Sequence, residues 1–328
     1  MIRVQFREGF PESLPVGNGT VTGTAGDGGK SGIMYKSERQ MKCDSGTSVQ
    51  EKLLHVLYDT MPGRMLLRPL ISPAFSKLGG YLLNTRLSAV AVSPFVRSYG
   101  IDLSECEKRH FSSYNAFFTR RLLPDARPVD CEPEALISPC DARLSVYPIT
   151  QEGRFRVKRT PYTVCELLRS EALARRYEGG LLWLFRLSVE DYHRYIYPDD
   201  ARKSVNRRIR GVFHTVNPIA NDCGPIYKEN TREYCVLDTA QFGPVVMMEV
   251  GAMLVGKIEN RHPQAARVRR GEEKGNFAFG GSTILLLTQK GRAVPEKQIL
   301  ENTRRGQETC VRQGERVGAK YGEECRKV

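Results

Sequence analysis

The sequence predicts an α+β fold in which a disordered N-terminus and a short helical segment precede a mainly antiparallel β domain with attached helices. Two observations carry this prediction. From about residue 102 onward, short apolar or β-branched runs alternate with Gly, Pro and Asp clusters, as in strands joined by turns. Between residues 49 and 101, apolar residues recur at helical spacing among Arg and Lys. We therefore expect three parts, 1–48, 49–101 and 102–328.

The first part, residues 1–48, is expected to be a disordered extension, because the stretch 17–32 has little apolar content. It contains Gly29-Lys30-Ser31, which resembles the end of a phosphate-binding loop. That loop needs a glycine where Thr24 stands and a hydrophobic strand before it, and the sequence has neither. We therefore predict no nucleotide site in this part.

The second part, residues 49–101, is predicted to form short amphipathic helices broken at Pro62, Pro69 and Pro73. A membrane-spanning helix needs roughly 18 to 20 apolar residues. Basic residues interrupt every candidate window, namely Arg64, Arg68, Lys77 and Arg86. Apolar faces flanked by basic residues are typical of helices that lie on a membrane surface, in the lipid interface. Packing of the same faces on the protein core is the alternative, and the sequence leaves both open.

The third part, residues 102–328, is predicted to be the catalytic domain. Short runs separated by turns imply a mainly antiparallel sheet. The clearest strands are residues 144–147, 181–187, 234–237, 245–250 and 284–287, and the clearest helix is 164–176.

The charge balance indicates a class of partner. The 50 Lys and Arg residues outnumber the 37 Asp and Glu residues, which gives a formal net charge of +13. Such a surface is attracted to nucleic acid or to a membrane rich in acidic lipid, where each basic residue adds about 1 kcal/mol. Because the sequence has no recognisable nucleic-acid module, we predict an anionic membrane as the partner and no nucleic acid. A basic surface without a partner is the alternative.

Nine cysteines are scattered along the chain without a Cys-x-x-Cys pair. This pattern favours reduced thiols in the cytosol over a disulfide framework or a zinc site. We therefore expect neither bridges nor a bound metal.

The tetrapeptide Gly280-Gly281-Ser282-Thr283 is the most plausible place for chemistry. Two glycines permit a strained backbone that brings a serine hydroxyl against the preceding carbonyl. Attack of Ser282 Oγ on the Gly281 carbonyl would turn the amide into an ester, and elimination would then leave a pyruvoyl group in place of Ser282. Alone, the tetrapeptide is equally compatible with a plain turn before a buried strand.

Further segments occur between about residue 58 and about residue 318 and decide between these interpretations. They are Phe117-Phe118-Thr119-Arg120-Arg121-Leu122, Ala126-Arg127-Pro128, Ser138-Pro139-Cys140-Asp141, Asp191-Tyr192-His193-Arg194-Tyr195, Val216-Asn217-Pro218, Val250-Gly251-Ala252 and Lys274-Gly275-Asn276-Phe277. Together, in this order and spacing, they resemble the phosphatidylserine decarboxylase family of pyruvoyl-dependent, self-cleaving proenzymes.

The resemblance implies cleavage between Gly281 and Ser282, which gives a β chain of residues 1–281 and an α chain of residues 282–328 that remain associated. It also implies a covalent pyruvoyl group, made from Ser282, that forms a Schiff base with phosphatidylserine and accepts electrons as CO2 leaves. The product is phosphatidylethanolamine. No metal is implied, and we expect a peripheral place on the cytoplasmic face of an anionic membrane. A homo-oligomer is compatible with these expectations.

The resemblance also implies site residues. Asp141 is expected as the carboxylate that orients a relay histidine, and Ser282 as the nucleophile. Family members carry a second histidine three residues after the first, but Ile196 stands there in this chain. Of the five histidines, His193 and His214 are therefore both candidates for self-cleavage, and His193 is the candidate for decarboxylation.

Two other interpretations stay open. Ile196, together with Ala142 where the family usually has glycine, would suit a pseudoenzyme that binds acidic lipid without maturing. A related pyruvoyl decarboxylase of another amine acid, or of another serine phospholipid, fits the same motifs. A conventional serine hydrolase is disfavoured, because Ile284 stands where a nucleophile elbow needs glycine.

Overall fold

The computed structural model describes residues 55–58, 60–252, 257–278 and 282–322 of the chain. The extension predicted to be disordered, residues 1–48, lies outside the described residues, as do Gly280 and Gly281. None of the helices in the described part has the length and apolar content that a bilayer crossing requires.

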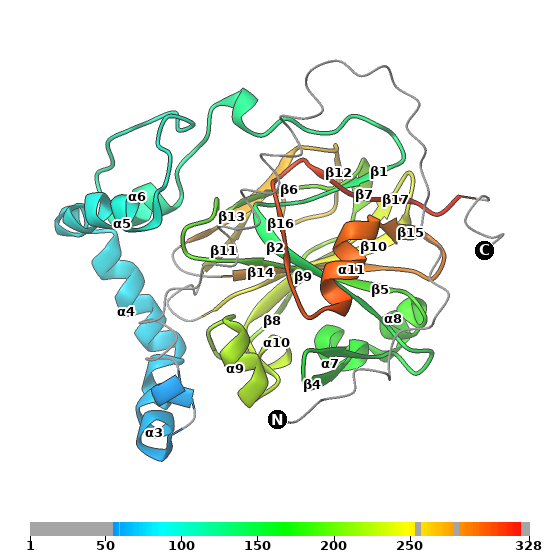
Figure 1. Ribbon diagram of the computed structural model, residues 1–328, viewed down its shortest axis with the longest axis horizontal. Helices are drawn as coiled ribbons and strands as arrows, with labels where there is room; N and C mark the ends of the chain where they lie inside the picture. The colour runs from blue at the N-terminus through cyan, green and yellow to red at the C-terminus, as the bar shows by residue number, and fades with distance from the viewer. Residues whose placement is uncertain (1–54, 59, 253–256, 279–281, 323–328) are drawn as a thin grey trace.

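A nine-stranded sheet forms the centre of the molecule (Figure 1). Its order is β12-β7-β9-β10-β14-β5-β2-β16, with β8 also paired to β9, and each of these pairs is antiparallel. The strands are β2 Ala142–Pro148, β5 Leu181–Leu187, β7 Ala201–Lys203, β8 Arg207–Ile209, β9 Arg232–Thr239, β10 Gly243–Val250, β12 Ala266–Val268, β14 Ser282–Thr288 and β16 Thr309–Val311. All five strands predicted from the sequence are present in this sheet, so the mainly antiparallel α+β prediction is confirmed.

Three smaller sheets surround the central one. They are β1 Ala135–Ile137 with β17 Arg316–Lys320 and β15 Ala293–Pro295; β11 Lys257–Asn260 with β13 Glu273–Ala278 and β6 Arg194–Ile196; and β3 Arg154–Val157 with β4 Thr160–Thr163. The strand β13 ends at Ala278, and β14 begins at Ser282 in the central sheet. The candidate cleavage site therefore lies where the chain passes from one sheet to another.

The predicted helical segment consists of α3 Met61–Leu70, α4 Pro73–Leu83, the 3-10 helix η1 Arg86–Ala91 and α5 Val92–Tyr99. Pro62 and Pro73 lie in the first turns of α3 and α4, where a missing N–H costs nothing. The predicted break at Pro69 is wrong, because Pro69 lies in the last turn of α3 and the helix ends one residue later. In Figure 1, α3 and α4 lie at the edge of the molecule, and Leu67 of α3 belongs to an apolar cluster that includes Leu184 and Leu285 of the central sheet.

The helix predicted over 164–176 is also wrong as a single element. The chain forms α7 Val164–Leu168, α8 Glu171–Ala174 and η3 Arg175–Tyr177 instead. Arg169 ends α7 in the left-handed conformation, with φ of 48°. A residue in that conformation turns the chain out of the helix. The remaining helices are α6 Tyr114–Phe118, η2 Pro124–Ala126, α9 Pro218–Cys223, α10 Ile226–Glu229 and α11 Lys297–Arg304.

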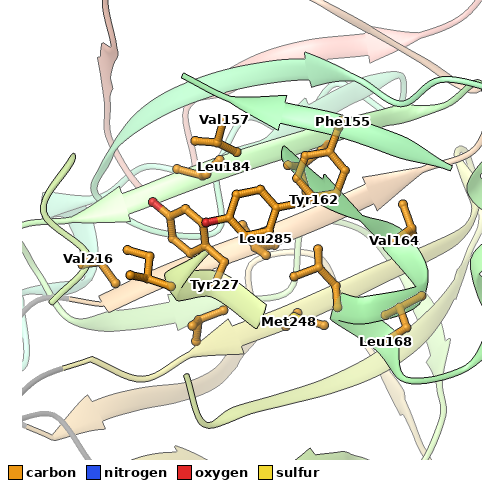
Figure 2. Packing of buried hydrophobic residues seen from close by; sticks show 14 of the residues in the cluster. Phe155, Val157, Tyr162, Val164, Leu168, Leu184, Val216, Tyr227, Met248 and Leu285 are labelled. Carbon is orange, nitrogen blue, oxygen red and sulfur yellow. The ribbon is translucent and has the colours of Figure 1, made fainter. Parts of the chain in front are cut away.

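Both faces of the central sheet are buried at its middle, which is why β5, β10 and β14 consist mostly of apolar residues. Figure 2 shows one face, where Leu184, Met248 and Leu285 pack under Tyr162 and Tyr227. The other face carries a second cluster that includes Trp183, Phe185, Ile284 and Leu286. Because side chains alternate along a strand, Ser282 shares the face of Ile284, and Thr283 shares the face of Leu285.

Among the cysteines, Cys106, Cys131, Cys140, Cys165 and Cys235 are free thiols. Cys310 is disulfide-bonded. The expectation that the chain has no bridges is therefore wrong at Cys310. In the part of the chain that the structure describes, no group of acidic, His and Cys side chains could hold a metal ion.

Candidate active site

Ser282 is the first residue of β14 and is fully buried. Its Oγ lies 3.4 Å from Nδ1 of His193. Two strands fix this contact, since Ser282 pairs in register with Leu187 of β5 and the Phe277 amide of β13 donates to the His193 carbonyl at 3.0 Å. Backbone pairing of the strand before the candidate cleavage site, β13, and of the strand after it, β14, thus holds the serine and the histidine together.

The hydrogen-bond partner of the second ring nitrogen determines the tautomer of His193. Nε2 of His193 lies 2.9 Å from the carbonyl oxygen of Ser188. A carbonyl only accepts, so Nε2 carries the hydrogen, and Nδ1 presents a lone pair to the Ser282 hydroxyl. The Phe118 ring stacks on the imidazole with a centroid distance of 4.0 Å. His193 is therefore oriented to take a proton from Ser282 Oγ.

Burial, and then the nearby Arg120 guanidinium, lower the pKa of His193 to about 3, against the opposite effect of the hydrogen bond to Ser188. The imidazole is neutral at pH 7 as a result. A neutral imidazole beside a serine hydroxyl is the arrangement in which a base activates a weak nucleophile.

Asp141 has other partners. Arg127 donates to its carboxylate from Nε at 2.9 Å and from Nη2 at 2.7 Å, and the Gln313 amide donates at 2.8 Å. Within the described residues, Asp141 makes no hydrogen bond to His193. It is linked to the histidine strand only indirectly, since the Gln313 side chain donates to the Arg194 carbonyl at 2.8 Å.

His214 lies apart from Ser282. Its Nδ1 is 3.3 Å from the Tyr58 hydroxyl, and its Nε2 is 3.3 Å from Glu229 Oε2. Tyr58 and Val216, two residues along from His214, both belong to the cluster on the Leu285 face of the sheet. Ser282 faces the opposite side. The structure therefore brings His193, and not His214, to the serine.

Ile196, in the position of the family's second histidine, is buried in β6. Its amide donates to the Pro139 carbonyl at 2.9 Å, so the strand is fixed there by its backbone. Sequence reasoning did not identify the Ser188 carbonyl as a partner of His193, because a backbone oxygen has no residue-type signal. Phe118 and Arg120 lie in one of the segments that resemble the family, and the structure brings both of them to His193.

The family model described as phosphatidylserine decarboxylase matches residues 114–319. That range contains every site residue discussed above and extends from α6 to β17.

Curated relatives match over most of their length. The chain is 44% identical to phosphatidylserine decarboxylase proenzyme 2 of Clostridium acetobutylicum, over 81% of this chain and 91% of the relative. It is 39% identical to the phosphatidylserine decarboxylase proenzyme of Ruminiclostridium cellulolyticum, with the same coverage. A proenzyme of this name from Clostridium botulinum is 35% identical over 88% of this chain and 99% of the relative. The family match over residues 114–319 and this level of identity mean that the chain belongs to the phosphatidylserine decarboxylase family.

Proposed function

We propose that this chain is a phosphatidylserine decarboxylase proenzyme that cleaves itself between Gly281 and Ser282 and converts Ser282 to a pyruvoyl group. The observation that carries the proposal is the contact between Ser282 Oγ and the unprotonated Nδ1 of His193. This contact is present although Ile196 replaces the family's second histidine. It favours a maturing enzyme over a pseudoenzyme.

In the cleavage step, His193 Nδ1 takes the Ser282 hydroxyl proton while Oγ attacks the Gly281 carbonyl carbon. The C–O bond forms, the C–N bond breaks, and the released nitrogen receives the proton from His193. Elimination then frees the Gly281 carboxylate, and addition of water with loss of ammonia leaves the pyruvoyl group. The site fits the first of these steps, because the serine and its base are already in contact and both are buried.

The pyruvoyl group supplies an electron sink for the loss of CO2 from phosphatidylserine. We propose that His193, which stays beside residue 282, then delivers a proton to the substrate carbon. Asp141 is proposed to support the site through Arg127 and Gln313, and His214 is proposed to have no part in either step.

Cleavage is proposed to leave the two chains associated. β14 begins the small chain, residues 282–328, and lies between β10 and β5 in the central sheet. Each of its apolar residues from Ile284 to Leu287 is buried, and burial of one such side chain contributes about 1.5 to 3 kcal/mol. We therefore assign residues 102–328 to one catalytic domain that persists after cleavage.

Residues 49–101 are proposed to attach this domain to an anionic membrane as a peripheral protein. Among the described residues, the exposed large apolar side chains lie between Val56 and Val90, except for Leu123 and Val205. The segment also exposes basic residues, Arg68, Lys77 and Arg86. Within the segment, Leu83, Phe95 and Val96 pack against α6, whose Phe118 stacks on His193.

The membrane proposal predicts the effect of charge on the apolar surface. Leu66→Glu combined with Leu87→Glu should weaken binding to vesicles containing phosphatidylserine by at least about 100-fold, because each leucine contributes about 1.5 to 3 kcal/mol when buried in lipid. Co-sedimentation measures the loss. Val205→Glu, an exposed apolar residue outside the segment, is the control. Equal binding by all three proteins would contradict the proposal.

Intact mass under denaturing and reducing conditions tests the proposed function, because Cys310 of the small chain is disulfide-bonded. Wild-type protein should separate into two chains, and the small chain should begin with a pyruvoyl cap at position 282. Ser282→Ala should remain one chain, because alanine has no hydroxyl to attack the carbonyl. A single uncut chain from freshly made wild-type protein would instead favour the lipid-binding pseudoenzyme.

A further inference from the structure

The guanidinium of Arg120 is buried beside the candidate active site with hydrogen-bond donors left unused. Arg120 follows α6 closely and is 6% exposed. In the part of the chain that the structure describes, its Nε and Nη1 atoms have no hydrogen-bond partner. Its Nη2 donates to the carbonyl oxygens of Glu190 at 3.3 Å and Asp191 at 3.4 Å. Both distances are long for an N–H···O bond, so these contacts hold the guanidinium weakly.

A buried cation with unused donors is costly unless an anion accompanies it. Arginine stays charged at pH 7, although burial lowers the pKa of Arg120. The nearby Cys106 thiol does not supply the counter-charge, because burial raises its pKa and keeps it neutral. The oxygens of a phosphate group would satisfy both the charge and the free N–H groups. The site therefore has the properties of an anion site that a ligand completes.

The surroundings of Arg120 indicate which ligand. Its Cζ lies 4.9 Å from the centre of the Phe117 ring. Phe117 belongs to an apolar cluster with Leu83, Phe95 and Val96 of the segment proposed to contact the membrane. Arg120 is also close enough to His193 to lower the pKa of its imidazole. The sequence of apolar cluster, guanidinium and His193 matches the sequence of acyl chains, phosphodiester and serine in phosphatidylserine.

We propose that Arg120 binds the phosphodiester of the substrate and thereby determines the preference for a phospholipid over a free amino acid. The inference rests on the proposed function. The headgroup carries a second anion, its carboxylate, but an arginine there would stabilise the charge that is lost as CO2 leaves. It would favour the substrate over the transition state and slow the reaction. The phosphodiester keeps its charge throughout, so binding it aids positioning without this penalty.

Two substrates separate phosphate binding from any general effect on the site. Monomeric dihexanoyl-phosphatidylserine carries the phosphodiester, and O-hexylserine has an uncharged ether in its place. Arg120→Met should lower kcat/KM for the phospholipid by about 10- to 100-fold, mainly through KM, because one charged hydrogen-bond donor is lost. For O-hexylserine the value should stay within about threefold of wild type. Arg121→Met, which changes the exposed neighbouring arginine, is the matched control and should keep the wild-type preference.

A binding measurement does not depend on the reaction. Dihexanoyl-phosphatidylmethanol has the phosphodiester but no amine, so it cannot condense with a pyruvoyl group. Calorimetry should show its affinity reduced about 10- to 100-fold by Arg120→Met, whereas the affinity for uncharged dihexanoylglycerol should not change. If the Arg120→Met protein does not fold, Arg120→Lys carries the test. Lysine keeps the charge but loses the planar donors, so binding should still weaken by at least about threefold.

Three outcomes would overturn the inference. One is an equal loss of kcat/KM for the two substrates in the Arg120→Met protein, which would mean that Arg120 only supports the site. Another is unchanged binding of phosphatidylmethanol in whichever Arg120 variant folds, and the last is an equal loss in the Arg121→Met protein. Failure of the wild-type protein to cleave would count against the proposed function alone, because binding of the amine-free lipid would still decide the role of Arg120.

Discussion

The His193→Gln protein should remain largely a single uncut chain, with self-cleavage slowed by about 100- to 10,000-fold. General-base catalysis contributes roughly 10² to 10⁴ in rate, and no other base contacts Ser282 within the described residues. Glutamine fills a similar volume but has no lone pair of comparable basicity. Denaturing electrophoresis over time measures the fraction cut.

His214→Gln is the matched control for this prediction. His214 is the other histidine candidate, but its contacts are with Tyr58 and Glu229 on the opposite face of the sheet. The variant should cleave at the wild-type rate. Cleavage of the His193→Gln protein, or a block in the His214→Gln protein, would remove His193 from its proposed role.

His193 should also affect how the free energy of unfolding depends on pH. Burial keeps the pKa of His193 at about 3 in the folded chain, below the roughly 6.5 of an unfolded histidine. Between these values the unfolded state binds more protons, so the stability contributed by neutral His193 is present above about pH 6.5 and is lost as the pH falls toward 3. In the uncut Ser282→Ala protein, the free energy of unfolding relative to the His193→Gln variant should therefore decrease on acidification. A difference that is independent of pH would contradict the assignment of a neutral, buried imidazole.

The strands could be predicted because both faces of the central sheet are buried. Residues 181–187 and 284–287 read as continuous apolar runs for that reason, and their boundaries in β5 and β14 follow the runs closely. The helix over 164–176 could not be predicted correctly, because its interruption depends on one residue, Arg169, in the left-handed conformation. Arginine has no particular preference for that conformation, and so the sequence carries no sign of it.

The site was predictable only in part. Ser282 and His193 lie in motifs whose order indicated the family, and the structure brings the two side chains together. His214 lies next to another of these motifs. The sequence could not predict that it packs on the opposite face of the sheet from Ser282, because that depends on tertiary packing. The partners of Asp141 likewise come from distant segments, Arg127 and Gln313. Residue type alone cannot tell whether the Asp141 carboxylate pairs with an arginine or with a histidine.

A buried ion pair joins β13, the strand before the cleavage site, to β10 of the central sheet. Lys274 of β13 lies 2.8 Å from Glu249 of β10, and neither side chain is exposed. Asn260 accepts from Lys274 at 2.9 Å and donates to Glu249 at 3.2 Å. Glu249 is opposite Ile284 in the register of β10 and β14. The pair therefore ties β13 to β10, the strand that pairs with β14, which begins with Ser282.

Lys274→Met should destabilise the uncut Ser282→Ala protein by about 3 to 5 kcal/mol, because it leaves the Glu249 charge buried without a partner. Adding Glu249→Leu should recover most of this loss, since an apolar pair of similar volume removes the cost of desolvating both charges. Lys257→Met, which breaks the exposed pair with Glu259, should change the stability by at most about 1 kcal/mol. Denaturant unfolding measures all three. Additive losses in the double variant would mean that the two charges act independently, and the tie between the strands on either side of the turn would then have to come from backbone pairing alone.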